Sequence, residues 1–279
     1  MAEHHGVELN TSLIRSLTLE AGEAATNLLN QKRSSSMSEP SQPLLITQMD
    51  GVMVPVVSFE ESTDRRKTKT LHWQEMRVGT VSVPGRTDAR YATSFHSADE
   101  LGDRLGIQVR DLGGDHTTQI HGLGDGASWI VEQGERIGGS NYSHLIDYYH
   151  FCEYIHAAFK EDPRAKLKIS RSKTEAKERH LNKVRRRLYR QLRSHPGHKE
   201  VSACIRYLAN RPGQFEYHKA IARGLPIGSG QVESTNRSLI QKRLKLPGAW
   251  WRRGTAAKIA CLRALRANER WEEIWQSAA

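Results

Sequence analysis

The feature that most constrains this chain is a β-rich region in its first third. LLITQMDGVMVPVVSF (44–59) and LHWQEMRVGTVSV (71–83) are dense in β-branched residues, and the second also alternates in polarity, which predicts strands. Asp50-Gly51 is a common turn pair, so we expect a bend between two strands there. This part of the chain cannot be read as a helical bundle.

Beyond this region the pattern changes to strands that run directly into helices. QIHGLGDGA (119–127) predicts a strand with a Gly-rich turn before a short helix, and YSHLIDYYHF (142–151) predicts a strand that becomes helical at about Phe151. HSADELGDRLG (96–106) has a serine cap and helical spacing. Strands first, then strand–helix alternation, then helices predict an α/β protein.

The two ends of the chain are expected to be helical. Residues 8–31 have apolar residues at helical spacing and a possible cap at Asn10 or Thr11, and KRSSSMSEPSQP (32–43) has the composition of a linker. Residues 254–276 predict one final helix, which follows the turn at 226–230 and a helical segment at 231–244.

Positive charge is concentrated in two blocks. The chain carries a net charge of +11, yet residues 164–199 alone hold 14 Lys and Arg against two acids, and residues 234–268 hold nine and no acid. The remainder is therefore net acidic. Concentrated cations on an acidic body indicate a polyanionic partner such as nucleic acid, although a solvated helix face or an anionic membrane surface would also be basic. Neither block has the strongly apolar face of a membrane helix, which favours nucleic acid.

Other classes are disfavoured by what the sequence lacks. No stretch approaches the roughly 18 apolar residues of a membrane span, and the first residues have no signal-peptide pattern. Cys152, Cys204 and Cys261 lie far apart with no zinc-ligand spacing, which is typical of reduced thiols in a cytosolic protein. We therefore expect a cytoplasmic protein with no membrane partner.

Three acids stand out because each lies near glycine after an apolar segment: Asp50, Asp125 and Glu233. Three carboxylates from separate segments suit hard cations such as Mg²⁺, and two such ions about 4 Å apart can support phosphodiester chemistry. Asp-Gly is also a common turn pair, so spacing alone leaves a purely structural role open. Gly228 and Gly230 would leave backbone N–H groups free near the third acid.

The chain resembles the transposases of bacterial insertion sequences, and among them most closely the ISKra-type group. The resemblance runs from about Leu44 to Leu265 and rests on four segments in the same order: MDGVMVP (49–55), GLGDGASWI (122–130), LIDYYHFCEYI (145–155) and PIGSGQVESTNRSLIQKRLK (226–245). It implies an RNase-H-like fold, with a mixed sheet, flanking helices and a catalytic Asp-Asp-Glu triad.

Carried over position by position, the resemblance makes Asp50, Asp125 and Glu233 the catalytic acids and the ligands of two Mg²⁺ ions, for which Mn²⁺ can substitute. The basic helical stretch, at about 160–222, then resembles an insertion between the second and third acids. Asp147 and His150 form a DxxH pattern similar to an accessory signature of related transposases. A helix-capping aspartate and a core histidine are the structural alternative.

DNA contacts are expected from cations and one aromatic residue near the third acid and in the insertion. Arg237 follows Glu233 by one helical turn, and Trp250 offers a stacking face beside arginines, whereas Trp251 is expected in the core. The complete predicted set is Arg185, Arg186, Arg187, Arg237, Lys242, Arg243, Lys245, Trp250, Arg252 and Arg253.

The resemblance implies a DNA transposase, a polynucleotidyl transferase that cleaves an element's end and joins it to target DNA. Its partners would be terminal inverted repeats and target DNA, bound by a homo-oligomer at the bacterial nucleoid. Residues 1–31 resemble a remnant of an N-terminal DNA-binding region, followed by the linker 32–43 and the catalytic domain 44–279. Two alternatives remain: another nuclease on the same fold, such as an RNase H or junction resolvase, and a truncated transposase remnant that binds DNA without catalysis.

Overall fold

The computed structural model describes residues 9–32, 39–59 and 68–276. The chain is organised as two units, which are described separately. Unit 1 comprises Met1–Thr118 and Gln231–Ala279, and unit 2 comprises Gln119–Gly230. Unit 1 therefore contains two of the three predicted acids, Asp50 and Glu233, and unit 2 contains Asp125.

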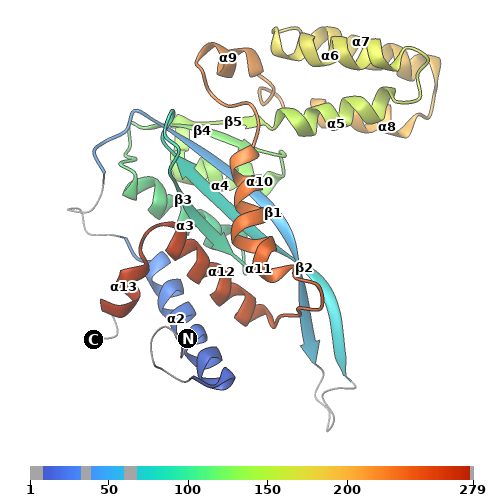
Figure 1. Cartoon of the computed structure of the whole chain (residues 1–279). Coiled ribbons are helices and arrows are strands. Elements are labelled where there is room, and N and C mark those ends of the chain that lie inside the picture. The colour runs from blue at the N-terminus through green and yellow to red at the C-terminus, as the bar shows by residue number, and fades with distance from the viewer. Residues whose placement is uncertain (1–8, 33–38, 60–67, 277–279) are drawn as a thin grey trace. The chain divides into compact units, whose positions relative to one another are not determined.

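The strands of unit 1 form an antiparallel arrangement in the order β3–β2–β1 (Figure 1). They are β1 (Leu44–Phe59), β2 (Lys69–Ser82) and β3 (Ala89–Ser94). The predicted bend at Asp50-Gly51 is wrong, because β1 passes through both residues without interruption. Asp50 pairs with Val78 and Gly51 with Arg77, so the turn propensity of Asp-Gly is overridden by a complete strand ladder on β2.

Both predicted N-terminal helix caps of unit 1 are confirmed. Helix α2 (Thr11–Leu29) begins after Asn10, whose side chain accepts a hydrogen bond from the Leu13 N–H at 2.7 Å. Helix α3 (Ala98–Asp111) begins after Ser97, whose hydroxyl accepts from the Glu100 N–H at 3.0 Å. Each cap satisfies one of the N–H groups that a helix start leaves without a partner.

Helix α2 shares the apolar core of unit 1. Ala25 and Leu29 of α2 are fully buried in the cluster formed by the strands and by α12 (Arg253–Ala267). The Arg104 side chain donates to Asn30 at 2.8 Å and thereby ties the end of α2 to α3. Of the predicted linker, residues 33–38 lie outside the described residues, whereas the Glu39 N–H donates to the Asp111 carbonyl at the end of α3.

The predicted final helix at 254–276 is in fact two helices, so that prediction is wrong. Helix α12 ends at Ala267 and α13 (Trp271–Gln276) follows. Between them Glu269 has φ 60°, and the buried Asn268 side chain accepts from the Tyr91 N–H and donates to the Tyr91 carbonyl. The Asn268 side chain thus pairs with the backbone of β3. Helix α12 ends just before this residue, so that its side chain can reach Tyr91.

Unit 2 begins with a strand–helix–strand arrangement. Strands β4 (Gln119–Gly124) and β5 (Tyr142–Ile146) are parallel, and they are connected by α4 (Ser128–Gly138) and the short 3₁₀ helix η2 (Gly139–Asn141). Gly134 allows α4 to approach β5 closely, because a Cβ at this position would lie 2.0 Å from Cζ of Tyr142.

The rest of unit 2 is helical, and this includes the basic stretch at about 160–222 that was predicted to be helical. Its helices are α5 (Tyr148–Phe159), α6 (Ala165–Lys177), α7 (Leu181–Ser194), α8 (Lys199–Ala209) and α9 (Tyr217–Ala222). Helix α5 begins at Tyr148, slightly before the expected position. On α7, Val184 and Leu188 are fully buried.

These elements confirm an α/β chain with both antiparallel and parallel strand pairs and flanking helices. Among the described residues, no helix combines the length and apolar character needed to cross a membrane.

Candidate active site and nucleic-acid interface

The first acid, Asp50, is tied to the helix that carries the third. Helix α10 (Gly230–Thr235) continues as a π-helical turn, η3 (Asn236–Gln241), and as α11 (Lys242–Leu244). The Asn236 amide donates to Asp50 Oδ2 at 2.7 Å, and the Val232 N–H donates to Gln48 Oε1 at 3.0 Å. These four residues, Gln48, Asp50, Val232 and Asn236, are called the β1–α10 frame below.

Glu233 lies between the two helix residues of this frame. Gln48 and Asp50 share one face of β1 because side chains alternate along a strand, and Val232 and Asn236 share one face of a helix because they are four residues apart. The two hydrogen bonds therefore hold the first helical turn around Glu233 against the part of β1 that carries Asp50. The Glu233 side chain itself is exposed. A π-helical turn directly after such a residue is frequent at functional sites.

The frame offers oxygen atoms that could hold a divalent cation. Asn236 is 4% exposed, and its Oδ1 has no hydrogen-bond partner among the described residues. A buried amide oxygen without a partner is uncommon and calls for an explanation, such as a bound ion or water. Carboxylate and amide oxygens are the ligands that Mg²⁺ prefers, so the donors present fit that ion.

Asp125 follows β4 directly, as predicted, and lies in a tight turn. Its Oδ1 accepts from the Ala127 N–H at 2.8 Å, and Gly126 has φ 82°, which favours glycine. The Tyr207 hydroxyl donates to the Asp125 carbonyl at 2.9 Å, and Arg211 Nε donates to the Gly126 carbonyl at 2.9 Å. Burial raises the pKa of Tyr207, so its hydroxyl remains a donor. The half-buried Asp125 is therefore held by helix α8 and the residues after it.

Asp147 has the capping role that was the structural alternative. It is fully buried, and its Oδ1 accepts from the Tyr149 and His150 N–H groups at the start of α5. Its Oδ2 accepts from both the N–H and the hydroxyl of Ser229. With both oxygens occupied and no exposure, Asp147 orients the loop that precedes Glu233. His150 is 40% exposed and lies 3.3 Å from Glu153, so it is not a core histidine.

The backbone N–H groups near Gly228 and Gly230 include two that form hydrogen bonds within the protein. The N–H of Ser229 is bonded to Asp147 and that of Val232 to Gln48. These groups therefore position the loop and the helix and are not available to a phosphate.

The predicted arginines of α7 differ from one another in their contacts. Arg187 forms an ion pair with Glu175 at 2.9 Å and donates to the Ser172 hydroxyl at 2.8 Å, whereas Arg185 donates to the Leu208 carbonyl at 3.3 Å. Arg186 is exposed. Two members of the run therefore join helices of unit 2, and Arg186 is the one directed to solvent.

The predicted cations that follow Glu233 are all exposed: Arg237, Lys242, Arg243, Lys245, Arg252 and Arg253. Four of them lie over aromatic rings: Arg243 is 4.8 Å from Trp251, Lys245 is 5.5 Å from Trp73, Arg252 is 5.3 Å from Phe59 and Arg253 is 5.8 Å from Phe95. Arg253 donates to the Phe95 carbonyl at 2.8 Å and so also anchors the start of α12.

The two neighbouring tryptophans have different environments, as predicted. Trp251 is half-buried against the core of unit 1, its indole N–H donates to the Leu244 carbonyl, and its backbone pairs with β1. Trp250 is 50% exposed and has the Lys69 ammonium over its ring. It borders a hollow of about 610 Å³ that Arg15, Phe59 and Arg252 also line.

Sequence reasoning missed the contribution of the β1–β2 hairpin to this aromatic and basic surface. Phe59 and Trp73 are 37% and 54% exposed, and Lys69 lies at the start of β2. The available sequence signal was the presence of aromatic residues in strands, one of which alternates in polarity. Only the register of the hairpin places these aromatic residues beside the segment after Lys245.

Within either unit, the described residues contain no group of three or more His, Cys, Asp or Glu side chains arranged to hold a metal ion. The predicted triad draws Asp50 and Glu233 from unit 1 and Asp125 from unit 2.

The protein is an α/β chain with an acid-bearing frame in unit 1 and basic helices in unit 2. The chain belongs to an uncharacterised protein family, UPF0236, whose model matches residues 9–274. No curated protein matches the sequence.

Proposed function

We propose that this protein is the catalytic part of a DNA transposase, an Asp-Asp-Glu enzyme that cleaves the ends of an insertion sequence and joins them to target DNA. The proposal rests first on the four ordered sequence segments that resemble such enzymes. The single structural observation that supports it best is the β1–α10 frame, because its two hydrogen bonds bring the helical turn of Glu233 to the strand of Asp50.

In this proposal Asp50, Asp125 and Glu233 hold two Mg²⁺ ions, which would supply activation of the attacking oxygen and stabilisation of the leaving oxygen. Asn236 keeps the Asp50 carboxylate oriented through its 2.7 Å hydrogen bond. The hydrogen bonds of Asp147 to Ser229 hold the loop from which Glu233 follows. Such supporting contacts matter because catalytic ligands must be held in place before substrate binds.

The reaction would have two steps, each an exchange of one phosphodiester bond. Water attacks the phosphodiester at the element's end, the P–O3′ bond breaks and a free 3′-OH is released. That hydroxyl then attacks a phosphodiester of the target DNA, forming one bond and releasing one target 3′-OH. The exposed cations of α7 and of residues 237–252 would hold the DNA backbone throughout, on a homo-oligomer in the bacterial nucleoid.

The decisive experiment replaces each acid by its amide: Asp50→Asn, Asp125→Asn and Glu233→Gln. Each change keeps the size of the side chain but removes the charge that holds a divalent ion, so we expect nicking of supercoiled plasmid in Mg²⁺ or Mn²⁺ to fall by several orders of magnitude. DNA binding measured without metal should be unchanged. Ser234→Ala, next to the third acid, is the matched control and should cleave like the parent.

An acid variant that cleaves at the parental rate would refute the site. A parent protein that binds DNA but never cleaves it in either metal would instead support the second candidate, a DNA-binding remnant without catalysis. The exposed cations favour that candidate independently of the acids, because binding needs only positive charge at the surface.

A further inference from the structure

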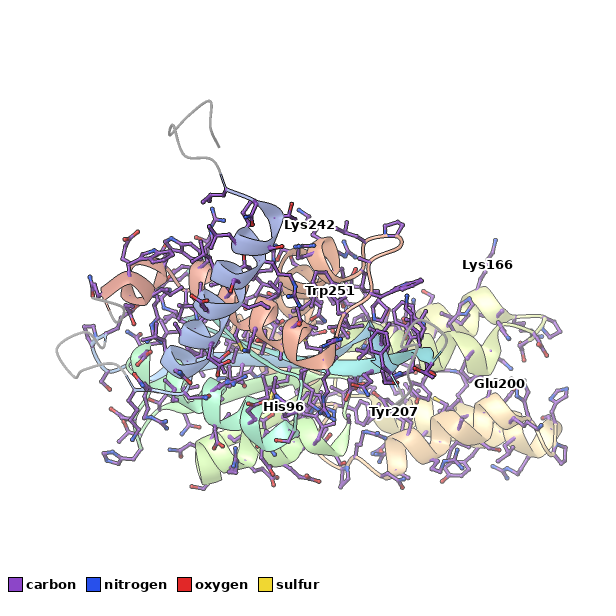
Figure 2. All side chains as sticks on the ribbon, turned by 90° about the horizontal axis from the view of Figure 1, so that it is seen from below. His96, Lys166, Glu200, Tyr207, Lys242 and Trp251 are labelled. Carbon is purple, nitrogen blue, oxygen red and sulfur yellow. The ribbon has the colours of Figure 1, made fainter. Side chains whose placement is uncertain are left out.

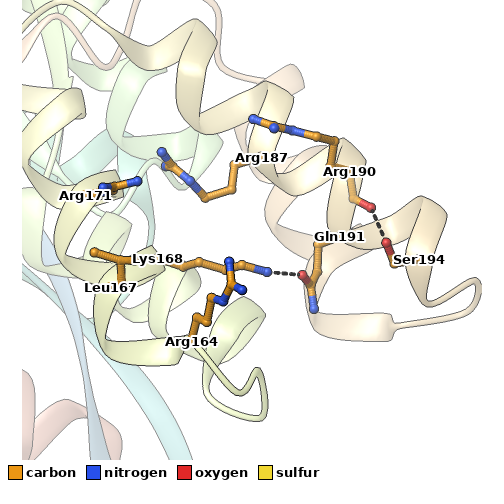
Figure 3. Close-up of a pocket in the computed structure, with 8 residues that line it drawn as sticks. All are labelled: Arg164, Leu167, Lys168, Arg171, Arg187, Arg190, Gln191 and Ser194. Atoms are coloured by element: carbon orange, nitrogen blue, oxygen red, sulfur yellow. Dashed lines mark hydrogen bonds between the residues drawn. The ribbon is translucent and has the colours of Figure 1, made fainter.

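A strongly basic cleft lies between α6 and α7 in unit 2. It encloses about 300 Å³, and the side chains that line it come from both helices (Figure 3). They are Arg164, Leu167, Lys168, Arg171, Arg187, Arg190, Gln191 and Ser194. Five of the eight carry a positive charge and none is acidic.

Two of these cations are neutralised by contacts that hold the walls of the cleft together. Lys168 donates to Asp162 Oδ2 at 2.5 Å and to Gln191 Oε1 at 2.7 Å, so it joins α6 to α7. Arg187 pairs with Glu175 and thereby joins the same two helices. The cleft is consequently a rigid feature of the insertion, since charge-assisted bonds cross it at two points.

The other three cations form no ion pair with any described residue. Arg164, Arg171 and Arg190 are exposed. Arg190 Nε donates a weak 3.4 Å hydrogen bond to the carbonyl of Arg186 on its own helix. Three like charges around one cavity repel one another unless an anion lies between them. These three arginines therefore give the cleft an unbalanced positive charge of three.

The chemistry of the cleft selects phosphate over an apolar or aromatic ligand. Leu167 is its one apolar lining side chain, whereas ligand pockets for bases or peptides are mostly apolar. Guanidinium groups bind phosphate oxygens in a two-pronged fashion. Arg164 and Arg171 are seven residues apart, about 10 Å along a helix, so the charges follow a line of phosphates better than a single one.

We propose that the α6–α7 cleft binds successive phosphates of a DNA backbone through Arg164, Arg171 and Arg190. The inference rests on the proposed function insofar as it takes DNA as the partner, but it requires no catalysis. Arg185 and Arg187, by contrast, form contacts within unit 2.

The test compares two double variants of the full chain that lose the same charge from the same two helices. Arg171→Gln with Arg190→Gln removes two cleft cations. Lys166→Gln with Arg193→Gln removes two exposed cations outside the cleft, where Lys166 points away from the ribbon (Figure 2). Binding of a labelled DNA duplex of mixed sequence is followed by fluorescence anisotropy without divalent metal, between about 50 and 200 mM salt. Thermal unfolding verifies that both variants fold.

Each lost phosphate contact lowers the slope of log affinity against log salt by about 0.9. The magnitude of this slope should therefore be smaller by about 2 in the cleft variant, which should also bind DNA about tenfold more weakly at 0.1 M salt. The control variant should keep the parental slope. Equal slopes for parent and cleft variant, or equal losses in both variants, would overturn the proposal.

A second arm distinguishes the DNA backbone from free phosphate by calorimetric titration with inorganic phosphate. A cleft variant that loses phosphate binding but keeps the parental DNA slope would assign the cleft to a free anion and also overturn the proposal. If the parent chain cleaves DNA but the cleft variant keeps the parental salt slope, only the proposed role of the cleft is refuted. If the salt slope of the cleft variant falls as expected but the parent chain never cleaves DNA, only the proposed transposase activity is refuted.

Discussion

The β1–α10 frame of unit 1 and the helices α6 and α7 of unit 2 use polar side chains in opposite ways. In the frame, hydrogen bonds connect residues 184 and 186 positions apart, and Gln48 and Asn236 are 3% and 4% exposed. Between α6 and α7 the side-chain contacts span 12 to 23 positions, and several arginines are exposed. One region fixes a few groups across the whole chain, and the other displays many groups on locally formed helices.

This difference shows which task each region suits. Chemistry on phosphodiesters requires a small number of oxygens held in place by buried contacts, and a single misplaced ligand is costly. Binding a DNA backbone requires charge density, to which each cation contributes a modest and nearly independent part. Substitutions should accordingly have large, all-or-none effects in the frame and small, graded effects on the helices.

Among substitutions outside the three acids, the largest effect is expected from Asn236→Leu. The change removes the donor to Asp50 and the unpaired Oδ1 while keeping the volume, so the free energy of unfolding should change little and cleavage should fall by roughly 10–100-fold, as for other supporting contacts of metal ligands. Plasmid nicking and urea unfolding measure the two quantities. Thr235→Val, a similar polar-to-apolar change at the adjacent buried position, should retain cleavage. Parental activity in Asn236→Leu would remove the frame from the proposed site.

A smaller effect is expected on the aromatic surface of unit 1. Trp250→Ala should weaken binding of single-stranded DNA by about tenfold, because stacking of one base contributes about 1–3 kcal/mol, and it should leave thermal stability nearly unchanged. Trp251→Ala should show the reverse, since this indole packs on the core and donates to Leu244. Anisotropy and thermal melting distinguish the two. Equal losses of affinity would mean that Trp250 has no specific role in stacking.

The smallest change in binding is expected within the arginine run of α7. Arg187→Gln should lower the melting temperature by several degrees, because Glu175 and the buried Ser172 lose their partner at a cost of about 1–3 kcal/mol. Arg186→Gln should leave the melting temperature unchanged and weaken duplex binding about threefold at low salt. If Arg186→Gln instead destabilised the protein and Arg187→Gln did not, the assignment of the two roles would be reversed.

Local sequence patterns accounted for much of the secondary structure. The caps at Asn10 and Ser97, the strands on either side of residue 60 and the basic helices all follow from propensity and periodicity, which act over a few residues. The failures occurred where a distant partner prevailed. Asp50-Gly51 lies inside a strand because β2 pairs along its full length, and the last helix breaks because Asn268 completes the pairing of β3.

The candidate site divides in the same way. The sequence by itself determined which residue types are present: three carboxylates near glycines, two basic blocks and a pair of tryptophans, since charge and side-chain chemistry do not depend on folding. Only the tertiary structure decided that Asn236 contacts Asp50, that Asp147 is occupied by Ser229 and that Arg187 faces Glu175 while Arg186 faces solvent. These outcomes depend on contacts between segments far apart in the chain or on adjacent helices, and a local pattern carries no information about which segment will lie opposite.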